Sequence, residues 1–175
     1  MNRIAMTDTE LLIYRHLFLS HLDYVEVHRK DSEYRNMSLR ECFLVMFPMQ
    51  APSLVTVDGT RLSIQASKSH YSHTDLYSQK LGIDRCANIG PWRTYEVLAG
   101  NIVKEPDLNW DEYRCWDGIW ADIPSRMVAD YLDEHGGITE TYSNGVLTKF
   151  SVTEDDVIHN SYDYRIQSHV HERNR

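Results

Sequence analysis

The first apolar pattern of the chain predicts a helix. Thr7 and Glu10 have the spacing of a capping box, in which a hydroxyl at the N-cap and a carboxylate three residues later satisfy free backbone N–H groups. We therefore expect a helix over about 8–22, and the charged stretch 23–36 stays open between a helix extension, a strand and a loop. The apolar residues at helical spacing are Leu11, Tyr14, Leu17, Phe18 and Leu22.

Two further segments carry helix patterns. Ser38 and Glu41 repeat the capping-box spacing before an apolar run that prolines stop, which predicts a short buried helix over about 39–47. A helix over about 124–135 begins at a proline and ends before two glycines. Its residues Val128, Tyr131, Leu132 and His135 fall on one face, and Asp130, Asp133 and Glu134 fall on the opposite face.

Turn dipeptides between β-like runs predict two hairpins. Asp58-Gly59 separates the runs 54–57 and 60–66 and favours a two-residue type I′ turn, in which both central residues have positive φ. Asn144-Gly145 predicts the second hairpin. In that hairpin Glu140 is expected to lie across from Lys149, and Tyr142 across from Leu147.

These elements together define a fold class. A further strand is expected over 93–98, the polar segment 67–92 reads as a long connection, and 162–170 is a candidate last strand. The sequence therefore predicts a single α+β domain over residues 1–175. Its antiparallel sheet contains two tight hairpins and is packed by about three helices.

The overall charge narrows the classes of partner. The chain has 26 acidic residues against 18 Lys and Arg, a net charge of −8. Nucleic acids and anionic membranes attract basic surfaces, so we expect neither direct nucleic-acid binding nor membrane binding. Three widely spaced cysteines suit a reducing compartment, and the N-terminus lacks the apolar core of a signal peptide. A cytoplasmic protein is therefore expected.

Part of the chain is similar to a known class of proteins. The strings VTVDGTRLSIQAS, HYS, TYEV and WADIPSRMVADYLDEHGGI lie between Val55 and Ile138. They resemble small uncharacterised proteins carried by phages and other mobile elements. The resemblance implies a phage or mobile-element origin and no specific activity.

Negative charge and tryptophan are concentrated in one segment. Between Glu105 and Glu134, nine acidic residues accompany two basic ones and three of the four tryptophans. Three of these acids form the ordinary polar face of the amphipathic helix expected over 124–135. The stretch 105–122 contains the other six acids and one base, and their spacing does not follow a helical period.

Two interpretations of the stretch 105–122 compete. Its tryptophans are either core residues among solubilising acids, or they belong to a partner-binding or nucleic-acid-mimicking surface. The candidate partner-binding residues are Asp107, Trp110, Asp111, Glu112, Trp116, Asp117 and Trp120.

Two H-x-S triplets offer an enzymatic alternative. Paired H-x-[ST] motifs resemble those of two-histidine phosphoesterases, and the triplets here begin at His70 and His159. That resemblance implies that the two histidines act as base and acid while Ser72 and Ser161 hold the phosphate of a phosphodiester or cyclic nucleotide. Surface or loop histidines are the competing interpretation, because two such short matches are unsurprising in a chain with nine histidines.

The preferred function is non-enzymatic. We expect an interaction protein whose acidic aromatic region engages a basic surface of a host protein, and inhibition of a nucleic-acid-targeting defence system would fit the charge. Self-association through the tryptophan region, giving a homo-oligomer, is a further interpretation. The sequence has no P-loop, no G-x-G-x-x-G and no C-x-x-C, so we expect no cofactor and no metal.

Overall fold

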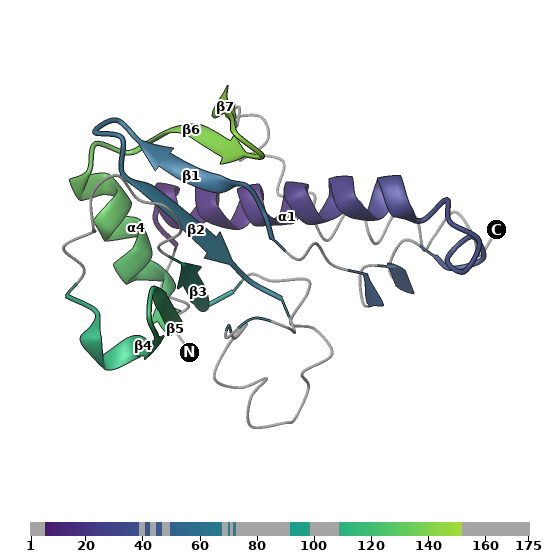
Figure 1. Ribbon diagram of the computed structural model, residues 1–175, viewed down its shortest axis with the longest axis horizontal. Helices are drawn as coiled ribbons and strands as arrows, with labels where there is room; N and C mark the ends of the chain where they lie inside the picture. The colour runs from purple at the N-terminus through teal and green to yellow at the C-terminus, as the bar shows by residue number, and fades with distance from the viewer. Residues whose placement is uncertain are drawn as a thin grey trace.

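The computed structural model describes residues 6–38, 41–42, 45–46, 50–67, 70, 72, 92–98 and 109–151. Within these ranges the fold is α+β, with one antiparallel seven-stranded sheet and two α-helices. The strand order is β4-β5-β3-β2-β1-β6-β7, and Figure 1 shows α1 running behind the strands. In chain order the elements are α1 Asp8–His28, β1 Ser53–Thr56, β2 Arg61–Gln65, β3 Thr94–Leu98, η2 Asp111–Tyr113, β4 Arg114–Trp116, β5 Ile119–Pro124, α4 Ser125–Glu134, β6 Ile138–Ser143 and β7 Val146–Lys149.

Helix α1 confirms the first predicted helix and extends it to His28. The capping box is present, because the Glu10 backbone N–H donates to the Thr7 hydroxyl and the Thr7 backbone N–H donates to the Glu10 carboxylate. The charged stretch 23–36, for which the sequence left three interpretations, therefore begins as an extension of this helix. The fully buried Val25 anchors that extension, and its carbonyl accepts the backbone N–H of Arg29 at 2.8 Å.

The short helix expected over 39–47 is described only in part. Glu41, Cys42 and Val45 are helical, and the remaining residues of its interior lie outside the described ranges. Its capping box is present, with Ser38 N–H donating to the Glu41 carboxylate at 2.7 Å. The candidate strand over 162–170 also lies outside the described residues.

Helix α4 confirms the predicted helix near the C-terminal hairpin. It runs over Ser125–Glu134, with Pro124 at the N-cap rather than in the first turn. At the other end, Gly136 N–H donates to Asp133 O and Gly137 N–H donates to Leu132 O, and both glycines have positive φ. This pair of bonds is the Schellman motif, which satisfies carbonyls that the helix leaves open.

The β1–β2 hairpin is present, but its turn differs from the two-residue type I′ turn that was expected. Gly59 has a φ of +82°, whereas the φ of Asp58 is not positive. Gly59 N–H donates to Thr56 O, so the loop contains three residues, Val57 to Gly59. The reason is local: the Asp58 carboxylate accepts the Thr60 backbone N–H at 3.0 Å, which holds the aspartate in an ordinary conformation.

The β6–β7 hairpin has the predicted turn and register. Asn144 and Gly145 both have positive φ, Glu140 pairs with Lys149, and Tyr142 pairs with Leu147. The expected strand over 93–98 is β3. A third hairpin, β4–β5, was not predicted, although its turn dipeptide Asp117-Gly118 is the same pair of residue types that was recognised in β1–β2.

The core lies between the two helices and one face of the sheet. Cross-strand pairs Leu54–Leu62 and Ile64–Val97 place buried side chains on that face. Both helices contribute further buried residues to the same cluster, among them Ile13, Tyr14, Leu17 and Phe18 of α1 and Val128, Ala129 and Leu132 of α4. None of the described helices is both long enough and apolar enough to cross a membrane.

One carboxylate joins the N-termini of both helices. Glu10 is only 4% exposed, and besides its Thr7 contacts it accepts the Ser125 hydroxyl at 2.6 Å and Arg126 Nε at 3.1 Å. Burial alone would raise the pKa of Glu10, but the hydrogen bonds from Ser125 and Thr7, with Arg126 nearby, lower it overall. The position near two helix N-termini also favours the negative charge.

Replacing Glu10 by Gln should lower the free energy of unfolding by about 2–3 kcal/mol, because hydrogen bonds to a charged group each contribute about 1.5–3 kcal/mol and some are retained by the amide. Urea denaturation at pH 7 measures this. The matched control is Glu26→Gln on the exposed side of the same helix, where a change within about 0.5 kcal/mol is expected. Equal effects of the two variants would contradict the assignment.

Candidate functional site

The acidic aromatic region is described from Asn109 onward, and Glu105 and Asp107 lie outside the described residues. It forms the short helix η2 followed by the β4–β5 hairpin. This hairpin lies at one end of the sheet, with β4 outermost, as Figure 1 shows. The described candidate residues are therefore divided between η2 with its N-cap Trp110, the edge strand β4, the turn and the neighbouring strand β5.

Two of the three candidate tryptophans are core residues. Trp110 is 4% exposed and Trp120 is 8% exposed. Their rings pack edge to face with centroids 6.5 Å apart, and Trp110 packs in the same way on Tyr131 of α4 at 5.4 Å. These rings therefore fix the hairpin to α4, and the expected contact role of Trp110 and Trp120 is replaced by a structural one.

Trp116 has the opposite environment, since it is 62% exposed. Arg114 pairs with Trp120, but Trp116 pairs with Ile119, so β4 contains one extra residue, Cys115. Successive residues of β5 face opposite sides, so Trp116, which pairs with Ile119, lies on the side of the sheet away from the buried Trp120. The bulge places Arg114, two residues earlier, on the Trp120 side.

A second bulge, in β5, fixes Asp122 in the sheet. Tyr95 pairs with Ile123 and Val97 with Trp120, which leaves β5 one residue longer than β3 over this interval. Asp122 lies in the extra stretch with a φ of 55°, a conformation that aspartate tolerates better than most residues. Its carboxylate accepts the Thr94 hydroxyl at 3.3 Å, which indicates a structural role.

Three acids within five residues of Trp116 in the sequence are exposed. Asp111 and Glu112 lie in η2 before β4, and Asp117 follows β4 in the turn. Arg114 forms an ion pair with Asp117, but the two side chains are 49% and 98% exposed, so water screens this pair. We call residues Asp111–Asp117 the acidic edge; it has three acids, one base and one exposed indole.

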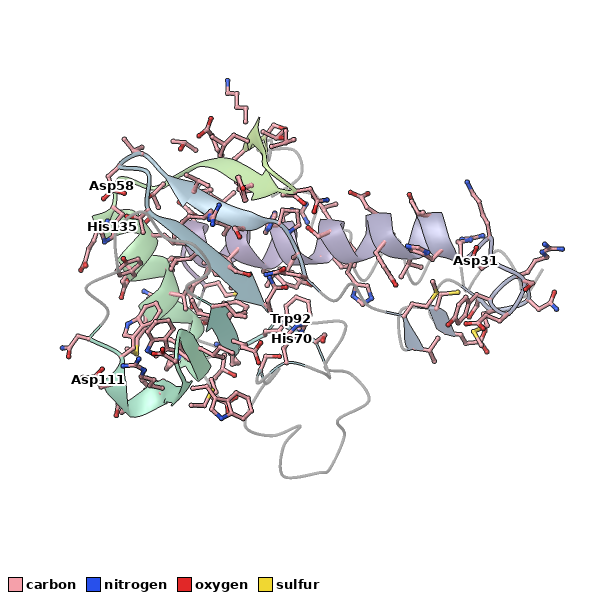
Figure 2. All side chains as sticks on the ribbon, in the orientation of Figure 1. Asp31, Asp58, His70, Trp92, Asp111 and His135 are labelled. Atoms are coloured by element: carbon pink, nitrogen blue, oxygen red, sulfur yellow. The ribbon has the colours of Figure 1, made fainter. Side chains whose placement is uncertain are left out.

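A cluster that sequence patterns did not reveal links the β1–β2 turn to the end of α4. His135 Nδ1 lies 2.5 Å from Asp58 Oδ2 and 3.2 Å from the Thr60 hydroxyl, and Figure 2 shows Asp58 beside His135. The other oxygen of Asp58 accepts the Thr56 hydroxyl at 2.7 Å. The sequence separation of 77 residues between Asp58 and His135 explains why no local motif predicts the contact.

The chemistry of this cluster is that of an oriented histidine. Asp58 accepts from Nδ1, so a neutral imidazole holds its proton there and presents Nε2 as the acceptor. The described residues include no hydroxyl or thiol hydrogen-bonded to Nε2. The turn also packs closely on the end of α4, because a Cβ atom added at Gly136 would lie 2.8 Å from the Cβ of Val57. The cluster thus anchors the turn on α4.

Of the two H-x-S motifs behind the phosphoesterase hypothesis, the structure describes the histidine and the serine of the first one only. His70 Nδ1 lies 2.7 Å from the Ser67 hydroxyl, and the 6% exposed Ser72 donates its hydroxyl to Ser67 O. These bonds build a turn after β2. His159 and Ser161 lie outside the described residues, so the phosphoesterase stays a prediction.

Neither metal-ligand geometry nor similarity to known proteins assigns a chemistry to the chain. Across the described ranges, no group of three His, Cys, Asp or Glu side chains is placed to hold a metal ion. No family model, no curated protein and no solved structure matches the chain. The geometry of the residues is therefore the basis for any functional proposal.

The Asp58–His135 contact predicts a pH dependence of stability. Hydrogen bonds from His135, Thr56 and Thr60 hold the pKa of Asp58 well below its ordinary value. Because the folded state has the lower pKa, this stabilisation is fully present above the unfolded pKa of about 3.9 and is lost progressively as the pH falls below it.

Urea midpoints at pH 7 and pH 3 measure the effect. Asp58→Asn should be less stable than the parent protein at pH 7, and the difference should shrink at pH 3. The control Asp130→Asn alters an exposed acid on α4 and should show no such pH-dependent difference. A difference for Asp58→Asn that is the same at both pH values would refute the role of its charge.

Proposed function

We propose that this protein is a non-enzymatic interaction protein that binds a basic surface of a host protein through its acidic edge. The observation that carries the proposal is Trp116, which is 62% exposed on the outermost strand β4 and flanked by exposed acids. An exposed indole is costly to leave in water, whereas in an interface it supplies a large contact area.

Charge supports the choice of a basic partner. Asp111, Glu112 and Asp117 outnumber Arg114 within the acidic edge, and the whole chain has a net charge of −8. A concentrated field of one sign accelerates the encounter with a partner of opposite sign. Asp107, outside the described residues, adds to the same charge in the sequence and stays in the proposed contact set.

The buried rings beneath the edge support the proposal by their rigidity. Trp110, Trp120 and Tyr131 form a continuous packed set that fixes the hairpin to α4. A surface held in one conformation loses little conformational freedom on binding, so more of the contact energy appears as affinity.

The charge supports the class of partner, and a phage or mobile-element origin is part of the same proposal. Host proteins that bind nucleic acid carry basic surfaces, which an acidic protein of this kind can occupy in place of nucleic acid. A phage or mobile-element protein that inhibits a nucleic-acid-targeting defence system fits this description, and we propose this as the biological role.

Charge reversal combined with salt variation tests the proposal. The full chain is used to capture its partner from host lysate, and the dissociation constant of the purified pair is measured by calorimetry at 50 and 300 mM salt. We expect weaker binding at the higher salt concentration. Changing Asp107, Asp111, Glu112 and Asp117 together to Lys should weaken binding at least tenfold, as should Trp116→Ala, because central aromatic contacts commonly contribute 2 kcal/mol or more.

Matched controls separate the acidic edge from total charge. Reversing four exposed acids elsewhere, Asp23, Glu26, Asp130 and Glu134, makes the same change in net charge and should have a much smaller effect. Leu147→Ala on β7, also an exposed apolar residue, controls for Trp116→Ala. If the two charge reversals weaken binding equally, the acidic edge is not the contact surface.

A further inference from the structure

We infer that β7 is a self-association edge, at which two copies of the chain pair their β7 strands antiparallel and join their sheets into one. This strand lies at the opposite end of the strand order from β4 and the acidic edge, so the inference does not rest on the proposed function (Figure 1). The occupant is a second copy of this chain. The backbone, the exposed side chains and the charge of β7 each support it.

The register of the last hairpin determines which backbone groups of β7 point outward. Phe150 N–H donates to Thr139 O at 2.9 Å, which makes these two residues a hydrogen-bonded pair of the β6–β7 ladder. Such pairs alternate with non-hydrogen-bonded pairs along an antiparallel ladder. Thr148 therefore bonds to β6, whereas Leu147 and Lys149 direct their backbone N–H and C=O groups away from it. Among the described strands, none lies on that outer side of β7.

The same groups of a second copy can satisfy these outward groups. When Thr148 lies on the two-fold axis, opposite Thr148 of the second copy, Leu147 exchanges both backbone hydrogen bonds with Lys149 of the second copy. An axis at Lys149 would place two lysines directly opposite each other, which is unfavourable. An axis at Leu147 would place Lys149 opposite Gly145, inside the turn. The axis at Thr148 is therefore the register that uses both outward residues of each copy.

This register also covers the exposed apolar side chains of β7. Val146 is 60% exposed and Leu147 is 55% exposed. Opposite Val146 lies Phe150 of the second copy, a half-buried residue that packs against the core. Opposite Leu147 lies Lys149 of the second copy, whose methylene stem can cover the leucine while its ammonium group stays in water. Both apolar side chains therefore lose contact with water on pairing, which favours association.

The β6–β7 ladder is regular up to this edge. Its register runs from Glu140–Lys149 to Ser143–Val146 without a shift, whereas a bulge interrupts the β4–β5 ladder at the other end of the sheet. Bulges and prolines are features by which natural edge strands avoid pairing with another chain. Strand β7 has neither, since its four residues are Val-Leu-Thr-Lys. Its backbone therefore offers a regular template for another strand.

Charge indicates which edge can accept a second copy. The net charge of −8 makes two copies repel each other at long range. Self-pairing at the acidic edge would add to this repulsion, because that edge has three acids and one base. The charged residue of β7 is Lys149, which pairs in register with Glu140 of β6, so this edge has no excess of negative charge. Pairing between identical chains should consequently select β7 over β4.

The sign of a charge placed at residue 147 tests the register. Leu147→Glu would lie opposite Lys149 of the second copy, whereas Leu147→Lys would place two lysines there. Each contact occurs twice in a symmetric dimer, so we expect the dissociation constant of the Leu147→Glu dimer to be at least tenfold lower. Sedimentation equilibrium of the full chain over a series of concentrations measures both constants. Net charge alone predicts the reverse order, because Leu147→Glu makes an acidic chain more acidic.

Matched variants on α1 control for net charge. Val27 is also an exposed apolar residue, and Val27→Glu and Val27→Lys change the net charge by the same amounts. These two variants should not show the order expected at residue 147. Because Leu147 is exposed, its variants should fold as the parent chain does, and circular dichroism with thermal unfolding verifies this.

Hydrogen exchange of backbone amides locates the pairing in the parent chain. Exchange at Leu147 and Lys149 should slow as the protein concentration rises, because their outward N–H groups become bonded only in the dimer. Exchange at Thr148 should be slow at every concentration, because its N–H bonds to β6. Exchange in 114–116 should not depend on concentration.

Three results would overturn the inference: a chain that stays monomeric over the concentration series, a Leu147→Lys dimer as tight as the Leu147→Glu dimer, or slowed exchange in 114–116 in place of Leu147 and Lys149. If exchange at Leu147 and Lys149 slows only when the captured partner is added, β7 binds that partner and self-pairing is also overturned. The charge reversal of the acidic edge decides the proposed function separately.

Discussion

The Glu10 carboxylate is the contact on which the arrangement of the helices depends. It completes the cap of α1 and receives Ser125 and Arg126 from the first turn of α4, so one buried charge determines how the two helices meet. A buried carboxylate is stable only when its hydrogen bonds are complete. This requirement makes the helix pair specific, because α4 cannot shift along α1 without leaving that charge unsatisfied.

Helix α4 in turn fixes two other parts of the structure, the β4–β5 hairpin and the β1–β2 turn. Its Tyr131 packs against Trp110, which holds the β4–β5 hairpin, and also against His135, which holds the β1–β2 turn through Asp58. The acidic edge and the histidine cluster are therefore fixed to the same helix face. Rigid support of this kind explains how a three-residue strand can present Trp116 in a defined direction.

Much of the fold was predictable because its determinants are local. The capping box at Thr7 and the Asn144-Gly145 turn involve residues a few positions apart, and the structure confirms both. The β4–β5 hairpin was missed because bulges at Cys115 and around Asp122 break the alternation that identifies strands. The burial of Trp110 and the Asp58–His135 contact depend on α4, a distant element, so no local pattern contains them.

The pairing next to the β4–β5 turn has a consequence for how this surface could arise or disappear. The side of the sheet that Trp116 occupies is set by its pairing with Ile119 across the Asp117-Gly118 turn, and not by the chemical type of the residues. Removing Cys115 would make this pairing regular, with Arg114 opposite Trp120 and Trp116 still opposite Ile119, so the indole would keep its side. A change in the length of the Asp117-Gly118 turn by one residue would instead shift the pairing and exchange the outward-facing side chains in one step, whereas substitutions would alter them one at a time.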